Sequence, residues 1–188
     1  MYNRNDDAAS MVGERCGRCG LRRAFLCVLI AISAVKVFAA ADHCMPDEQV
    51  IFSCGMKTSS KVLSICASRV LSKDKGYIQY RFGAPGNVEL EFPSSREGSQ
   101  GKFAYFHYFR AQVDRTEVGF KNGKYEYSVF SDYEGDIKPE TYKSGVSITD
   151  SSSGKEQTFL CRGKPVNRLA LLSKIIPCEE DEASGACQ

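Results

Sequence analysis

The stretch GYIQYRFGAPGNVELEF, residues 76–92, decides the fold because it carries two strand patterns joined by a short turn. In 78–82 and again in 88–92, apolar side chains alternate with polar ones. A period of two places the apolar side chains on one face of a strand and the polar ones on the other. The segment APGN, residues 84–87, has the residue types that form turns. The stretch therefore predicts an antiparallel hairpin with one apolar face.

Pairing the two apolar faces also restricts the partner of Arg81. A shift by one residue would turn every side chain to the opposite face, so Arg81 must lie opposite Glu89 or opposite Glu91. Either cross-strand pair would contribute about 0.2–1 kcal/mol. We therefore assign Arg81 to an ion pair on the polar face, with ligand binding as its alternative role.

Two further hairpins follow along the chain. In TEVGFKNGKYEYSVF, residues 116–130, the pair Asn122-Gly123 is typical of a two-residue type I′ turn. That turn would place Phe120 opposite Tyr125 on the core face. The runs 144–149 and 155–161, joined by DSSSG, predict another hairpin.

These patterns predict about nine short strands and one helix. The helix is expected over 166–174, where Val166 and Leu169 have helical spacing and Pro165 suits a first turn. The predicted fold class is all-β, an antiparallel meander that forms a small barrel or sandwich. Residues 42–178 would form this single domain, and the acidic segment 179–188 would be a tail.

Residues 1–41 have the features of an export signal. The basic pair Arg22-Arg23 precedes an apolar run over 24–35, and small residues end the segment at Ala39 and Ala41. This arrangement predicts a signal peptide cleaved after Ala41, and hence a periplasmic or secreted protein with no stable membrane span after cleavage. The run RRAFL also resembles a twin-arginine signal. The alternative is an inner-membrane anchor formed by residues 24–41.

Removal of this leader changes the charge and the cysteine count. The whole chain has 25 basic and 23 acidic residues and nine cysteines. Without the leader it has 19 basic and 20 acidic residues, which gives no electrostatic reason to expect a nucleic-acid partner. Six cysteines remain without the leader, and an exported chain meets an oxidising compartment. We therefore expect disulfides to stabilise the domain, and the sequence leaves their pairing open. At least one bond should tie a terminus to the sheet, and Cys187 should join Cys178 or stay free. The six disulfide candidates are Cys44, Cys54, Cys66, Cys161, Cys178 and Cys187.

The sequence offers little catalytic chemistry. It has two histidines, no clustered Cys/His spacing, no G-x-S-x-G motif and no phosphate-binding or dinucleotide-binding loop. We therefore expect no metal, no cofactor and no enzyme activity. The strand predicted over 101–110, GKFAYFHYFR, carries aromatic side chains on both faces. The candidate contact residues for a ligand or partner are Tyr105, His107, Tyr108 and Arg81.

Segments in the first and last thirds of the predicted domain resemble a family of exported bacterial β-rich proteins. The resemblance covers most of residues 44–178 and is most distinctive at YRFG, residues 80–83, and CRGKP, residues 161–165. It implies a cell-envelope or secreted location and implies no activity. Residues 144–147, SGVS, are also similar to the SGxxY motif of small disulfide-linked β-barrels that inhibit C-type lysozymes. Ile148 replaces the tyrosine, so no inhibitory residue is carried over.

The sequence thus favours an exported, non-catalytic β-domain that binds a protein partner in the manner of an inhibitor or immunity protein. The alternative function is a module that binds carbohydrate or another envelope ligand. Exposed tyrosine and phenylalanine faces would suit that ligand, because aromatic rings stack on sugars and fill interfaces.

Overall fold

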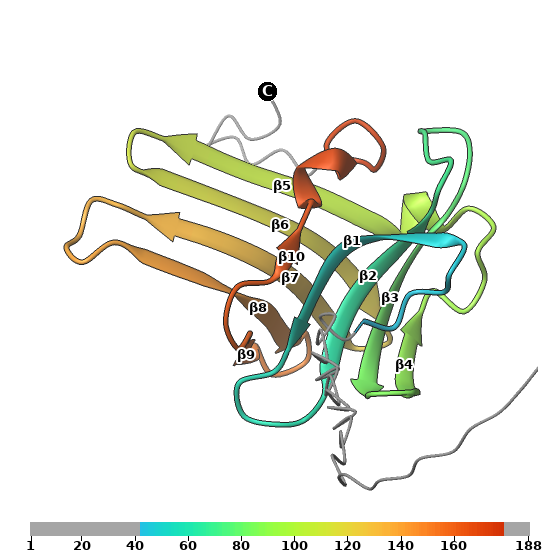
Figure 1. Ribbon diagram of the computed structural model, residues 1–188, viewed down its shortest axis with the longest axis horizontal. Coiled ribbons are helices and arrows are strands. Elements are labelled where there is room, and N and C mark those ends of the chain that lie inside the picture. The colour runs from blue at the N-terminus through green and yellow to red at the C-terminus, as the bar shows by residue number, and fades with distance from the viewer. Residues whose placement is uncertain (1–41, 179–188) are drawn as a thin grey trace, which may run out of the picture. The chain divides into compact units, whose positions relative to one another are not determined.

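The computed structural model describes residues 42–178, which form two antiparallel β-sheets of five strands each (Figure 1). The all-β prediction is confirmed. The predicted leader over 1–41, its cleavage after Ala41, its alternative role as an anchor and the acidic tail at 179–188 lie outside the described residues. Residues 42–178 contain no helix with the length and apolar character needed to cross a membrane.

The strands follow one another along the chain, apart from the last, which returns to the first sheet. The first sheet has the order β10-β1-β2-β3-β4 and the second β5-β6-β7-β8-β9. The first sheet comprises β1 (Glu48–Gly55), β2 (Val62–Ser68), β3 (Ile78–Ala84), β4 (Asn87–Phe92) and β10 (Val166–Asn167). The second comprises β5 (Phe103–Arg110), β6 (Val113–Asn122), β7 (Tyr125–Glu134), β8 (Thr141–Asp150) and β9 (Lys155–Leu160). Two 3-10 turns are η1 (Ser99–Lys102) and η2 (Leu169–Leu172).

Both sheets contribute to one apolar core. Ile51 and Leu63 of the first sheet are fully buried in the same cluster as Val118 of the second. Aromatic rings cross between the sheets, with Tyr80 and Phe120 centred 4.9 Å apart. In a chain without tryptophan, tyrosine and phenylalanine therefore supply the large core side chains.

The hairpin over 76–92 forms in one of the two predicted registers. Arg81 lies opposite Glu91, and Phe82 lies opposite Leu90. The register shifts between Phe82 and Gly83, so that Gly83 lies opposite Val88. A Cβ atom on Gly83 would come within 2.1 Å of the carbonyl oxygen of Asn87. The bulge therefore requires glycine at this position.

The hairpin at Asn122-Gly123 forms, but the predicted register was wrong. Phe120 lies opposite Tyr127 instead of Tyr125, and Asn122 still belongs to the ladder. The two turn residues are Gly123 and Lys124, and only Gly123 has a positive φ, of 61°. Glycine at the first central position is typical of a type II′ turn, which competes with type I′ for the same sequence.

The predicted helix over 166–174 is supported only in part. Val166 pairs with Ser53 as part of β10, and a single 3-10 turn over Leu169–Leu172 follows. Leu169 and Leu172 are both fully buried. Their spacing of three residues suits a 3-10 turn as well as an α-helix, so the apolar pattern alone could not separate the two.

Two disulfides join segments that are distant in sequence. Cys44 is bonded to Cys66, and Cys54 is bonded to Cys161 across 107 residues. Cys44 precedes β1, so the prediction that a bond ties a terminus of the domain to the sheet is confirmed. Cys178 is disulfide-bonded as well, and Cys187, its predicted partner, lies outside the described residues. Disulfides of this kind indicate an oxidising, extracytoplasmic environment.

Removing the bond that closes the longer loop should destabilise the fold strongly. We expect Cys54→Ala/Cys161→Ala to lose about 2–5 kcal/mol of unfolding free energy, because the unfolded chain gains conformational freedom. Urea denaturation of the oxidised wild type and variant measures the difference. Intact mass before and after reduction serves as the control on the bonds present. Fewer than two disulfides in the wild type, or equal stability of the two proteins, would contradict the pairing.

Candidate functional site

Arg81, a predicted contact residue, lies in the interior instead of on an exposed polar face. Only 1% of its surface is exposed. The predicted ion pair with Glu91 is present, but the polar side of β3 that carries Arg81 is covered at this position. The segment 42–47 and Glu48, which precede and begin β1, hydrogen-bond to this part of the sheet and cover it.

Protein acceptors occupy all five N–H donors of the Arg81 guanidinium group. Nη1 donates to Glu48 Oε2 at 2.5 Å and to the carbonyl oxygen of His43 at 3.0 Å. Nη2 donates to Glu48 Oε1 at 2.9 Å and to Gln79 Oε1 at 2.8 Å. Nε donates to Glu91 Oε2 at 2.7 Å. Because a guanidinium group has five such donors, none is left for a ligand.

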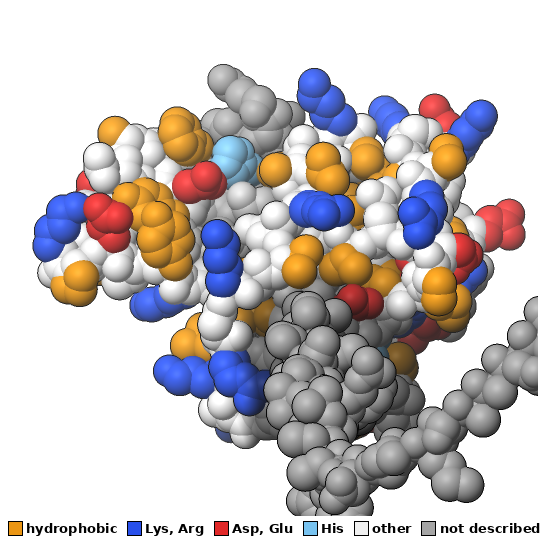
Figure 2. Space-filling model, viewed as in Figure 1, with side chains coloured by type: hydrophobic (Ala, Val, Ile, Leu, Met, Phe, Trp, Pro, Cys, Tyr) orange, Lys and Arg blue, Asp and Glu red, His pale blue; other side chains and the backbone are white. Residues whose placement is uncertain are grey.

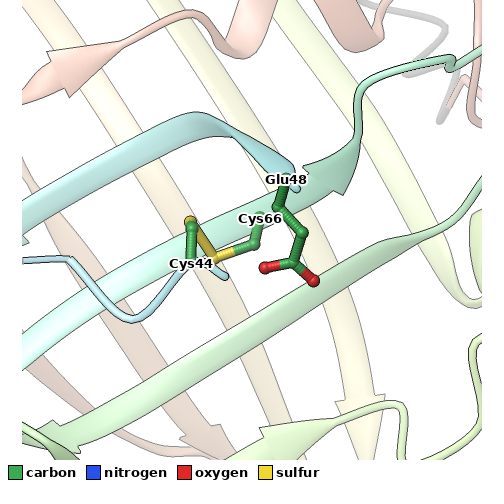
Figure 3. A group of neighbouring side chains, drawn as sticks. All are labelled: Cys44, Glu48 and Cys66. Carbon is green, nitrogen blue, oxygen red and sulfur yellow. A yellow bond between two sulfur atoms is a disulfide. The ribbon is translucent and has the colours of Figure 1, made fainter. Parts of the chain in front are cut away.

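The Cys44–Cys66 disulfide holds the segment 42–47, which we call the cover, over this network. Figure 3 shows the Cys44–Cys66 bond beside the Glu48 carboxylate. The two sulfur atoms and a carboxylate oxygen lie within 4.8 Å of one another, a spacing that would suit a metal ion. Here both sulfur atoms are in a disulfide and both carboxylate oxygens accept hydrogen bonds from Arg81. In the oxidised protein these three side chains therefore have a structural role and leave no atoms free to bind a metal ion.

The same network sets the ionisation of Glu48. Burial by itself would raise the pKa of this carboxyl, but the hydrogen bonds from Arg81, the Met45 N–H and the Tyr77 hydroxyl hold the pKa below its ordinary value. The folded chain therefore favours the carboxylate more than the unfolded chain does. This contribution to stability is present above the ordinary carboxyl pKa and is lost as the pH falls through the folded-state pKa.

Among residues 42–178, part of the inner face of the second sheet lies beyond the apolar core. Successive cross-strand rows run from β5 to β8, and the row of Tyr105, Val118, Val129 and Val146 belongs to the core. The nearer of the next two rows still meets the first sheet, because Asn167 Nδ2 of β10 donates to Ser131 Oγ at 2.8 Å. The farther row extends past the first sheet, toward the left in Figure 1. We call these two rows the uncovered face, and its residues are His107, Thr116, Ser131, Ser144, Phe109, Asp114, Tyr133 and Tyr142.

The outer row of this face exposes large aromatic side chains. Phe109 is 71% exposed and Tyr142 is 76% exposed. Tyr142 lies against Tyr133, with ring centroids 4.7 Å apart. Figure 2 shows hydrophobic side chains, acidic side chains and a histidine side by side at this end of the sheet. The uncovered face thus combines apolar rings with a neighbouring row of polar groups.

His107 is the only predicted contact residue on this face. Its Nε2 lies 2.9 Å from Asp114 Oδ1, and its ring lies 6.3 Å from the rings of Tyr105 and Phe109. Tyr105 was predicted as a contact residue, but it is 3% exposed and belongs to the core. Tyr108 points to the opposite face of β5 and is half-buried.

Sequence reasoning missed Tyr142 because the predicted strand began at residue 144. The observed strand β8 begins at Thr141. Alternation of Tyr142 with Ser144 and Val146 on one face was the available signal.

A cleft of about 690 Å³ adjoins the uncovered face. It lies where β7 and β8 meet residues 161–167, which we call the strap. Figure 1 shows the strap running from the end of β9 to β10. The lining residues of this strap cleft are Ser131, Asp132, Tyr142, Lys143, Ser144, Cys161, Gly163, Lys164, Pro165 and Asn167.

Asp132 in this lining has an unusual ionisation. Its Oδ1 is buried without a hydrogen-bond partner. Burial, with help from the nearby Glu117, raises the pKa of Asp132 to about 6, although Arg115 and Lys143 oppose the shift. The carboxylate form is therefore disfavoured in the folded chain.

Glu48→Gln should be strongly destabilising, because it leaves the buried guanidinium of Arg81 without its main counter-charge. We expect a loss of about 3 kcal/mol in urea denaturation. Glu89→Gln is the matched control, since Glu89 pairs with Lys61 at the surface of the same sheet. Its stability should stay close to that of the wild type. Equal losses in the two variants would refute the assignment of Arg81 to a structural role.

Asp132→Asn should stabilise the chain at alkaline pH and leave it unchanged in acid. Since the folded-state pKa is raised to about 6, ionisation weakens the fold as the pH rises from the ordinary carboxyl pKa through this value. After allowance for solvent screening at a half-buried group, we expect a gain of about 1 kcal/mol near pH 8 and none near pH 4. Thermal denaturation at the two pH values measures this, with the exposed Asp74→Asn as control. A gain of the same size at both values would be inconsistent with the raised pKa.

No protein-family model, no curated protein and no solved structure matches this chain. The resemblance to exported bacterial β-rich proteins stays a prediction.

Proposed function

We propose that this chain is an exported, non-catalytic β-sandwich domain that binds a protein partner. The observation that carries the proposal is the exposure of Phe109 and Tyr142 in one row of the uncovered face. Of the two predicted architectures, the sandwich fits better, since two separate sheets share one core.

The composition of the uncovered face supports a protein contact. Isolated exposed apolar side chains are common, but here Phe109 and Tyr142 share a row with Tyr133. Aromatic residues are enriched at the centres of protein interfaces, with polar groups around them. The row of His107, Thr116, Ser131 and Ser144 supplies such polar groups beside the rings.

The chemistry of the charged residues supports a non-catalytic role. All five N–H donors of the Arg81 guanidinium group are bonded to protein acceptors, so this buried cation has no donor left for a substrate. The His107–Asp114 pair could orient an imidazole for proton transfer, but such a role needs a substrate cleft beside it. The strap cleft does not include His107 among its lining residues.

Export is part of the same proposal. The two disulfides support an extracytoplasmic location, and the proposed signal peptide over 1–41, with cleavage after Ala41, would take the chain there. A partner in the envelope or outside the cell follows from that location.

A second candidate function is carbohydrate binding. The exposed ring of Tyr142 lies in the lining of the strap cleft together with the hydroxyls of Ser131 and Ser144 and the amide of Asn167. An aromatic surface beside polar groups suits a sugar ring as well as a protein.

Truncation of both exposed rings should remove partner binding. We expect Phe109→Ala/Tyr142→Ala to weaken capture of the partner by at least about tenfold, because two central aromatic contacts are lost. The full chain, exported by a bacterial host and purified in oxidised form, is immobilised and exposed to envelope and medium extracts. Bound proteins are quantified by mass spectrometry.

The matched control is Val70→Ala/Tyr125→Ala, which truncates two exposed side chains away from the uncovered face. A protein that the wild type and control retain and the test variant loses would support the proposal. Retention of the same proteins by all three, or of none by any, would sink it. Binding of a polysaccharide that depends on Tyr142 would favour the second candidate instead.

A further inference from the structure

Strand β8 has an open edge beside the strap cleft. β9 ends at Leu160, opposite Gly145, whereas β8 begins at Thr141. Residues 141–144 therefore extend past the end of β9, and no strand within 42–178 pairs with them on that side. β7 pairs with this stretch along its other side.

A disulfide draws the chain away from this edge. The Cys161 N–H still donates to the carbonyl oxygen of Ser144, at 2.8 Å. Cys161 is then bonded to Cys54 of β1, and the Arg162 N–H donates to the carbonyl oxygen of Gly55 at 2.8 Å. The strap thus turns toward the first sheet instead of continuing along β8. The strap cleft is the space that this turn leaves.

The backbone groups at the open edge face the cleft. The N–H and C=O of one strand residue point to the same side, and alternate residues share that side. Since the Ser144 carbonyl faces Cys161, the N–H and C=O of Tyr142 and the N–H of Ser144 also face the side that β9 has left. The cleft is lined by Ser144 from one face of the sheet and by Lys143 from the other, as expected of a space at an edge.

The charged side chains that line the strap cleft are two lysines and one aspartate. Lys143 and Lys164 line the cleft, and Arg162 is exposed in the strap. Asp132 is the one acidic group in the lining, and with a pKa of about 6 it carries less than a full charge in mildly acidic conditions. Charge complementarity therefore favours an acidic occupant.

We propose that residues 141–144 of β8 and the strap form a site into which a partner inserts an extended acidic peptide segment as an additional strand. The inference rests on the proposed protein-binding function and specifies how the partner docks. Strand addition of this kind draws affinity from main-chain hydrogen bonds and specificity from neighbouring side chains. Tyr142 belongs to both surfaces, so the inserted strand would lie directly beside the uncovered face.

Synthetic peptides test this site directly. The probe is a six-residue peptide of alternating valine and glutamate, titrated into the full oxidised chain. Backbone hydrogen exchange of Tyr142 and Ser144 reports the binding. Two matched peptides are a lysine analogue and a glutamate peptide methylated at alternate backbone nitrogens. The latter keeps charge and composition but cannot form the ladder.

We expect the glutamate peptide alone to slow exchange at Tyr142 and Ser144. Lys143→Glu/Lys164→Glu should weaken its binding by about tenfold, whereas the control Lys73→Glu/Lys75→Glu, in a loop of the first sheet, should not. No slowing at these amides, or equal slowing with the methylated peptide, would overturn the site. Slowing by an oligomer of galacturonic acid but not by the peptide would overturn it in favour of a glycan.

The partner capture described above separates the two proposals. If capture depends on Phe109 and Tyr142 but is unchanged in Lys143→Glu/Lys164→Glu, and the peptide fails, the protein-binding function stands and the strand-addition site falls. If the peptide binds as expected but capture is the same in every variant, the site stands as a peptide site and the uncovered face is not the partner surface.

Discussion

The ion pair between Arg81 and Glu48 lies where β1, β3, β4 and the segment before β1 meet. Both side chains are buried, and the guanidinium group reaches Glu48, Gln79, Glu91 and the backbone of His43 at once. Removal of one member of such a pair leaves a charge in the interior, which is far more costly than the net gain from forming it. The pair therefore ties the register of the first sheet to the position of the cover.

This constraint also shapes the surface that remains for function. Around Arg81 and Ser64, the outer polar face of the first sheet is covered by residues 42–47, which the Cys44–Cys66 bond joins to β2. The Cys54–Cys161 bond acts in the opposite sense, since it draws the strap toward the first sheet and leaves the edge of β8 open. The Cys44–Cys66 bond therefore helps to cover part of the first sheet, whereas the Cys54–Cys161 bond leaves part of the β8 edge exposed. Both effects follow from the same oxidised state, which links the proposed function to the extracytoplasmic environment.

Local sequence patterns predicted the elements well where strand neighbours are close in the chain. The alternation over 76–92 predicted the hairpin and limited Arg81 to two partners, of which Glu91 is the observed one. Glu48 could not be predicted as the main partner, because it lies 33 residues away and begins a strand that pairs with β2 and β10. The burial of Arg81 depends on that distant contact.

The candidate site was harder to predict for the same reason. Tyr105 and Phe109 have the same alternation in β5, yet Tyr105 is in the core and Phe109 is exposed. The difference arises from tertiary packing, which no single strand reveals: Tyr105 lies in the core shared by the two sheets and beside Pro177 and Cys178, whereas Phe109 lies beyond that core. The wrong register at Gly123 and the partly supported helix over 166–174 were local ambiguities of another kind, since two conformations fit each pattern.

Native-state hydrogen exchange tests the central position of the Arg81–Glu48 network most directly. Measured in increasing urea on the oxidised chain, exchange at the amides of β1, β2 and β3 should require global unfolding, whereas Tyr142 and Ser144 should exchange through local opening. The segment 42–47 and these three strands should lose protection together. Exchange of β1 to β3 at a lower free energy than the core of the second sheet would contradict it.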